Sequence, residues 1–145
     1  MTSMDNKTRQ EFNDCTSTII GCAMRVHTTL GNGFQEVIYQ RALEIEMGLA
    51  DLKFEREKSM PIMYREEHIG TRRVDFFVEG EIMVELKALV QLEEIHLAQA
   101  INYLEAYHVR TGLLINFGSN SLQFKRLFNK KINPNLKNSV NSINF

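Results

Sequence analysis

The sequence predicts an α/β domain of the α+β kind, with the element order ααβββαββ. Three observations lead to this prediction. Apolar residues recur at helical spacing in three segments of the chain. Two segments that alternate apolar and polar residues flank the turn-forming triplet Glu79-Gly80-Glu81, which is typical of a β-hairpin. The nearly all-apolar run GLLINF at residues 112–117 indicates a buried strand.

The first half of the chain predicts two helices and one strand. Residues 10–30 show helical periodicity and end at Gly31. A second helix runs from about residue 34 to 47, ends at Gly48, and offers five side chains to the core: Phe34, Val37, Ile38, Leu43 and Ile45. Residues 53–64 favour a strand, whose pairing Pro61 restricts. We interpret residues 65–71 as a polar turn.

The hairpin around Gly80 separates its side chains into two faces, because successive residues of a strand point to opposite sides. We expect one face to be core, with Val74, Phe76, Val78, Ile82, Val84 and Leu86. The other face carries Arg73, Asp75, Phe77, Met83, Glu85 and Lys87. A register centred on Gly80 places Asp75 directly opposite Glu85.

Two facing carboxylates need compensation. Opposed side chains have Cβ atoms about 5 Å apart, and like charges at that range repel by roughly 3 kcal/mol at an effective dielectric near 20. A divalent cation between Asp75 and Glu85 would turn this repulsion into binding, and carboxylate oxygens are ligands that Mg²⁺ prefers. Lys87 could then orient a water molecule or stabilise negative charge. The alternative is a solvent-facing hairpin whose acids pair with Arg73 and Lys87.

The second half of the chain predicts a helix and two strands. The helix covers residues 91–108, with an apolar side of Leu97, Ala100, Ile101 and Leu104 and an opposite side of His96, Gln99 and Tyr103. Strands follow at residues 112–117 and 122–128. We assign residues 1–128 to one domain and residues 129–145 to a basic, Asn-rich tail, which we expect to be flexible.

Composition bounds the class of protein. A chain of 145 residues with 43% hydrophobic residues can bury one core. All 18 acidic residues lie within residues 1–111, whereas residues 112–145 carry five Lys or Arg, which allows an anionic partner. Cys15 and Cys22 are about 10 Å apart along a helix, too far for a disulfide. No signal peptide or membrane-length apolar run is recognised, so we expect a cytoplasmic protein without a membrane partner.

Three motifs occur in order along these elements. Residues 33–39, GFQEVIY, fit G-x-x-E-x-x-Y; Asp75 and Glu85-Leu86-Lys87 fit D-x(9)-E-x-K; and residues 99–103, QAINY, fit Q-x-x-x-Y. Together they resemble the GxxExxY family, a branch of the PD-(D/E)XK nuclease superfamily, from about residue 19 to 128. The resemblance implies a restriction-endonuclease-like core, a mixed β-sheet flanked by helices.

The resemblance also implies roles for individual residues. Glu36, Asp75 and Glu85 would bind Mg²⁺ or Mn²⁺, and Lys87 would be the catalytic lysine. Gln99, Tyr103 and Tyr39 would contact substrate or shape the site. Each has a simpler interpretation: Glu36 could stabilise its helix as a first-turn acid, Tyr39 could be core, and Gln99 with Tyr103 could be a surface pair. Asp75 follows Val74 instead of a proline, a departure common across the superfamily.

The leading functional hypothesis is a metal-dependent nuclease, a phosphodiesterase acting on nucleic acid and on DNA in particular. The basic residues Lys125, Arg126, Lys130 and Lys131 could follow the phosphate backbone. The alternative is a non-catalytic module that binds nucleic acid or another partner and keeps the nuclease fold. Hydrolysis of another phosphodiester or nucleotide also stays open. A homodimer is compatible with a chain of this length.

Overall fold

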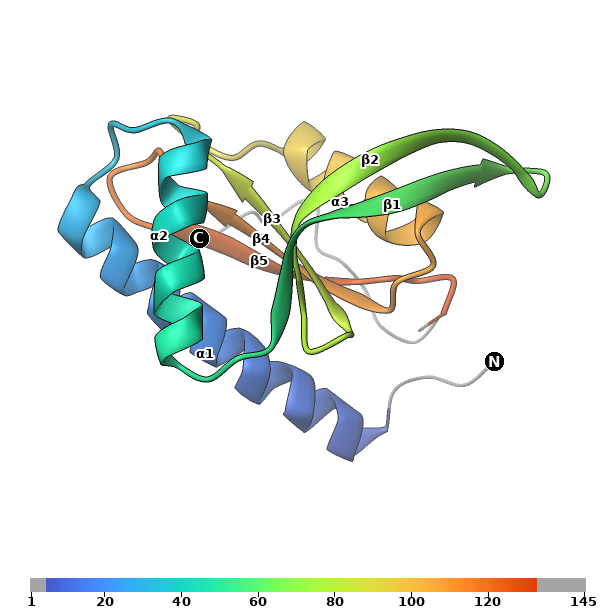
Figure 1. Ribbon diagram of the computed structural model, residues 1–145, viewed down its shortest axis with the longest axis horizontal. Helices are drawn as coiled ribbons and strands as arrows, with labels where there is room; N and C mark the ends of the chain where they lie inside the picture. The colour runs from blue at the N-terminus through green and yellow to red at the C-terminus, as the bar shows by residue number, and fades with distance from the viewer. Residues whose placement is uncertain (1–4, 133–145) are drawn as a thin grey trace.

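A computed structural model describes residues 5–132, which form a five-stranded sheet with helices on both faces (Figure 1). The order of elements is the predicted one: α1 (Asn6–Leu30), α2 (Glu36–Leu49), β1 (Phe54–Tyr64), β2 (Glu67–Val78), β3 (Ile82–Lys87), α3 (Glu94–Ala106), β4 (Thr111–Asn116) and β5 (Gln123–Phe128). The strands lie side by side in sequence order, and the sheet is mixed because β3 and β4 are parallel while the other neighbours are antiparallel.

The sheet separates two apolar clusters. The first joins α1 and α2 to one face through residues such as Ile19, Leu43, Phe76, Val84 and Ile115. The second joins α3 to the other face, and its buried members include Leu97, Leu104, Met83 and Leu114. Helix α3 connects the parallel pair β3 and β4, since such strands need a crossover between them.

The predicted hairpin register is confirmed next to the turn. Phe76 pairs with Val84, Phe77 with Met83 and Val78 with Ile82, so the turn is centred on Gly80. The backbone pairing ends there and does not include the expected pair of Asp75 and Glu85. Glu79 and Gly80 both have positive φ, of 54° and 67°. The expected faces are wrong for two residues. Val74 packs in the α3 cluster and not beside Phe76. Asp75 was expected on the face opposite Phe76 but is hydrogen-bonded to Gln40 of α2, the helix that covers the Phe76 face.

The irregularity lies where β2 passes Glu57 of β1. Arg56 pairs with Phe76 and Lys58 pairs with Val74, while Glu57 and Asp75 between them are skipped. Glu57 has a φ of 54°, a conformation that interrupts an extended strand. This break ends the strict alternation of side chains at Asp75 and explains why Val74 faces α3.

The interpretation of residues 65–71 as a polar turn is wrong for most of that segment. β2 begins at Glu67, and only Arg65 and Glu66, with φ of 48° and 68°, connect it to β1. Positive φ at both central residues is typical of a tight hairpin turn. In residues 61–71, the β1–β2 arm, the two strands pair only with each other and project past the rest of the sheet (Figure 1). Little of the arm is buried, so no apolar alternation marked it in the sequence.

The predicted core contribution of α2 is wrong for four of its five side chains. Leu43 is buried, but Phe34, Val37, Ile38 and Ile45 are exposed. The helix instead buries a narrow stripe of Tyr39, Gln40, Leu43 and Met47, at spacings of three and four residues. Periodicity alone could not distinguish this stripe from its neighbours, because both are apolar.

The other predicted helices are close to their observed bounds. Helix α1 buries Phe12, Thr16, Ile19, Ala23 and Val26, at the helical spacing that predicted it. Cys15 and Cys22 are both free. Within the described range 5–132, none of the helices has the length and apolar character needed to cross a bilayer.

The boundary of the predicted tail falls within the described residues. Asn129 is buried, and its amide donates to the backbone oxygens of Val109 and Leu104, at 3.0 and 3.4 Å. The ordered domain therefore continues through Asn129. Residues 133–145 of the predicted tail lie outside the described residues.

Candidate active site

The Asp75 carboxylate lies between α2 and β3. Its Oδ1 accepts a hydrogen bond of 3.0 Å from Gln40 Nε2, and its Oδ2 accepts one of 2.8 Å from the Leu86 backbone N–H. Gln40 is buried and in turn accepts a bond of 3.1 Å from Arg56 Nη1. The Asp75 side chain therefore bonds to the β3 backbone at the point where the β2–β3 backbone pairing has ended. These contacts fix the direction of the carboxylate.

The Glu85 carboxylate is buried on the neighbouring strand, with only 3% of the residue exposed. Both terminal nitrogens of the Arg72 guanidinium donate to it: Nη1 lies 3.0 Å from Oε1 and Nη2 lies 3.3 Å from Oε2. The Arg72 guanidinium also stacks on Tyr103 of α3, with Cζ 4.0 Å from the ring centroid. Glu85 is thus tied to β2 and α3.

Glu36 is the first residue of α2, and Lys87 is the last of β3. Their charges interact, since Lys87 lowers the pKa of the Glu36, Asp75 and Glu85 carboxyls. Among residues 5–132, no hydrogen bond or ion pair engages the Lys87 ammonium. A half-buried lysine beside three acids is available to a substrate or a water molecule.

Burial raises the pKa of all three acids. It raises the pKa of Glu85 to about 7, with the charge of Asp75 adding to the rise and Arg72 opposing it. It also raises the pKa of Asp75, against the hydrogen bonds from Leu86 and Gln40. Partial burial and the charge of Asp75 raise the pKa of Glu36. The three carboxyls therefore form one region in which negative charge is poorly compensated.

The chemistry of these donors suits a hard divalent cation, because carboxylate oxygens near uncompensated negative charge are what Mg²⁺ prefers. Their present arrangement does not yet form a site. Within the described part of the chain, no three His, Cys, Asp or Glu side chains lie close enough to hold a metal ion. Both Glu85 oxygens accept from Arg72, and both Asp75 oxygens accept from other donors.

The substrate-contact candidates lie in different surroundings. Gln99 is exposed on α3. Tyr103 is half-buried and packs on Arg72. Tyr39 is fully buried, stacks on Phe117, and uses its hydroxyl to donate to Gly31 O at 2.6 Å and to accept from Phe34 N at 3.1 Å. The structure therefore gives Tyr39 a role in holding the loop before α2, and substrate contact by Gln99, Tyr103 and Tyr39 stays a prediction.

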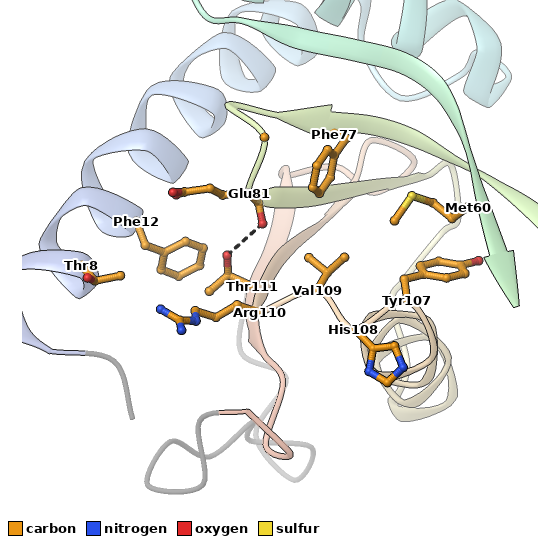
Figure 2. A pocket seen from close by; sticks show the side chains of 11 residues that line it. Thr8, Phe12, Met60, Phe77, Glu81, Tyr107, His108, Val109, Arg110 and Thr111 are labelled. Carbon is orange, nitrogen blue, oxygen red and sulfur yellow. Dashed lines mark hydrogen bonds between the residues drawn. The ribbon is translucent and has the colours of Figure 1, made fainter. Parts of the chain in front are cut away.

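A cavity of about 410 Å³ lies elsewhere in the molecule (Figure 2). Its lining includes Phe12, Phe77, Val109 and Thr111, and Thr111 Oγ1 donates to Glu81 O at 3.5 Å. None of the four predicted charged residues lines it. The cavity is therefore separate from the candidate site.

Sequence reasoning missed Gln40 and Arg72. Gln40 follows Glu36 by four residues, so the helical repeat could have placed both side chains on one face. Arg72 gave no such signal. It lies between the segment interpreted as a turn, residues 65–71, and the hairpin face that begins at Arg73, and its contact with Glu85 depends on the strand break beside Asp75.

Comparison with known proteins identifies the family. The sequence pattern of the PD-(D/E)XK nuclease superfamily matches residues 13–127. The chain belongs to this superfamily. The mixed sheet with flanking helices is consistent with its restriction-endonuclease-like fold, and its members generally use divalent metals and act on nucleic acid.

One solved structure, titled "Crystal structure of SSO0001", is similar to the chain with a TM-score of 0.50 at 18% identity. The similarity covers 63% of this chain and 48% of the other, so the chain spans about half the length of that protein. At this identity the similarity concerns the fold alone. No protein of curated function matches the chain.

Proposed function

We propose that this PD-(D/E)XK domain is a DNA nuclease that depends on Mg²⁺ or Mn²⁺. The observation that carries the proposal is the half-buried acid Asp75 beside the buried acid Glu85 on the neighbouring strand, with Lys87 beyond them and unpaired among the described residues. Such a concentration of poorly compensated charge is costly for the fold alone and is common at functional sites.

Each residue has a distinct role in this proposal. Asp75, Glu85 and Glu36 hold the metal, which when bound supplies a charge that activates water and stabilises the leaving oxygen. Gln40 and the Leu86 amide keep Asp75 oriented. The Lys87 ammonium positions the attacking water by donating a hydrogen bond to it beside the scissile phosphate. Membership of the GxxExxY branch and a cytoplasmic location belong to the same proposal.

The test is incubation with supercoiled, linear, single-stranded and branched DNA, and with RNA, in Mg²⁺ or Mn²⁺. We expect cleavage of a DNA substrate that stops on chelation and falls at least about 100-fold in Lys87→Ala, the range for a positioned proton-transfer group. Lys53→Ala, at an exposed lysine before β1, is the matched control. Cleavage that survives chelation or the loss of Lys87 would contradict the proposal.

A second candidate is a module that binds nucleic acid without cutting it. The observation that favours it is the ion pair of Arg72 with Glu85, which neutralises one acid without any metal. A binding module should bind DNA equally well with and without Mg²⁺ and leave every substrate intact. Cleavage by the wild type that is lost in Lys87→Ala would exclude it.

A further inference from the structure

Arg72 forms an ion pair with Glu85, one of the carboxylates on which the candidate metal site depends. Its guanidinium makes a two-pronged contact with Glu85, at 3.0 and 3.3 Å, so that each carboxylate oxygen accepts one N–H. The Glu85 side chain is only 4% exposed, whereas that of Arg72 is 30% exposed. The acid is therefore fixed in the interior, and the guanidinium is the member of the pair that has room to leave.

The surroundings hold Arg72 in this position. The Tyr103 ring lies under the guanidinium at 4.0 Å, a favourable contact for a cation. Burial raises the pKa of the nearby Tyr107 hydroxyl, and the Arg72 charge opposes that rise. The Tyr107 hydroxyl is buried and has no hydrogen-bond partner among the described residues. Tyr103 of α3 thus stacks on the guanidinium of β2, and Tyr107, which stacks on Tyr103, lies near enough for the Arg72 charge to affect its pKa.

A guanidinium in this place has two consequences for a metal ion. It uses N–H groups to occupy one lone pair on each Glu85 oxygen, and charge-assisted hydrogen bonds of this kind are strong. It also places a positive charge beside any cation that shares Glu85, which costs free energy in a partly buried site. Both effects oppose metal binding and neither depends on a third acid.

We propose that Arg72 acts as an internal cation that occupies Glu85 in the metal-free protein, and that a divalent metal binds Glu85 only when Arg72 releases it. Arg72 is then a positioning residue that weakens metal affinity. This inference rests on the proposed metal-dependent function. It explains why the acids suit a cation while their present arrangement does not form a site.

The test is the affinity for Mg²⁺ alone, measured by titration calorimetry at about pH 8.5, above the Glu85 pKa of about 7, so that protons compete little. Arg72→Gln removes the internal cation, and we expect it to bind Mg²⁺ about tenfold more tightly than the wild type, the gain expected when one charge-assisted competitor is lost. Arg73→Gln is the matched control, because Arg73 is the next residue, its side chain is 71% exposed, and its guanidinium lies 4.0 Å from the Glu57 carboxylate and not at Glu85. It should leave the affinity unchanged.

A double-variant cycle separates this effect from a general change in structure. In the Glu85→Gln background, Arg72→Gln should give no gain in affinity, because the contested carboxylate is gone. If Arg72→Gln does not fold, Arg72→Lys carries the test: it keeps the charge but loses the fork, and a gain of about threefold is expected.

The outcomes are distinguishable. Equal Mg²⁺ affinity of the wild type and the Arg72 variant, in a protein that still cleaves DNA with Mg²⁺, would overturn this inference and leave the proposed function intact. The same gain in Arg73→Gln, or a gain that persists in Glu85→Gln, would also overturn it. No Mg²⁺ binding by any variant, with no cleavage, would overturn both.

Discussion

At Glu85 the electrostatic cost of the site depends on pH. The carboxyl has a pKa of about 7 in the folded protein against an ordinary value of 4.5. A raised pKa means that the folded state binds the proton more tightly than the unfolded chain, so the contribution of this group to stability is full below about pH 4.5 and is lost as the pH rises through about 7.

This linkage predicts a difference between the wild type and Glu85→Gln. The free energy of unfolding of the wild type should fall between about pH 5 and pH 8 by up to about 3 kcal/mol from this group. The glutamine cannot ionise, so the variant should lack that part of the fall. Urea unfolding at several pH values measures it, and parallel profiles for the two proteins would show that Glu85 is not the group responsible.

Asp75 accepts hydrogen bonds at both oxygens, which makes its replacement informative. Asp75→Asn turns one acceptor into a donor that faces Gln40 or the Leu86 amide, so we expect a loss of about 1–3 kcal/mol in the metal-free protein despite the relief of charge repulsion. Saturating Mg²⁺ should raise the melting temperature of the wild type and raise that of the variant much less. Asp51→Asn, at an exposed acid after α2, is the control. An equal rise in all three proteins would mean that Asp75 does not bind the metal.

Among the elements, α2 is held at its start by one buried hydroxyl. Tyr39 bridges Gly31 and Phe34, and so fixes the loop from which α2 and Glu36 begin. Tyr39→Phe keeps the stack on Phe117 but leaves two backbone groups without this partner, and we expect a loss of about 1–3 kcal/mol in the free energy of unfolding. Tyr64→Phe, at an exposed ring of β1, should change it by less than about 0.5 kcal/mol. A neutral Tyr39→Phe would show that the loop does not depend on the hydroxyl.

The elements differ in how far the sequence could predict them. The turn at Gly80 and the flanking apolar runs predicted the β2–β3 register, because both strands pack against helices there. The outer half of β2 could not be predicted, since an arm with two solvated faces needs no apolar repeat. The buried stripe of α2 was ambiguous because Val37, Ile38 and Ile45 are as apolar as the residues that became core.

The candidate site shows the same limit. The order of Glu36, Asp75, Glu85 and Lys87 along the chain was visible as a motif, and their charges do interact in the structure. The groups that hydrogen-bond to Asp75 and Glu85 and hold their carboxylates in place were not visible in the sequence. Arg72 contacts Glu85 from the neighbouring strand, and Asp75 reaches the Leu86 amide only because the backbone pairing ends beside it.

At the scale of the whole molecule, charge asymmetry bears on nucleic-acid binding. Arg126, one of the basic residues expected to follow a phosphate backbone, instead donates to Thr16 and Ser17 of α1, at 2.8 and 3.1 Å. Lys131 lies 3.7 Å from Glu105. Lys130 is exposed, which makes it the better candidate for phosphate contact.

This difference predicts a change in salt dependence. Lys130→Gln should weaken DNA binding at all sequences and reduce the slope of log affinity against log salt concentration by about one. Arg25→Gln, which removes an equal charge from a residue paired with Glu46, should leave the slope unchanged. Fluorescence anisotropy over a range of salt concentrations measures both. Equal slopes for Lys130→Gln and the wild type would exclude a phosphate contact by Lys130.

The β1–β2 arm shares a strand with the candidate site, since β2 runs from the arm through Arg72 to Asp75. Strand β3, paired on both sides, belongs to the most protected part of the sheet, whereas the arm has only its own two strands. The Arg72–Glu85 ion pair connects the base of the arm to this protected strand. If metal binding breaks the ion pair, amide hydrogens at residues 61–71 should exchange with deuterium faster in Mg²⁺, while those of β3 exchange more slowly. The exchange rate of the β1–β2 arm would then show whether a metal occupies the site, although the arm itself does not contact the ion.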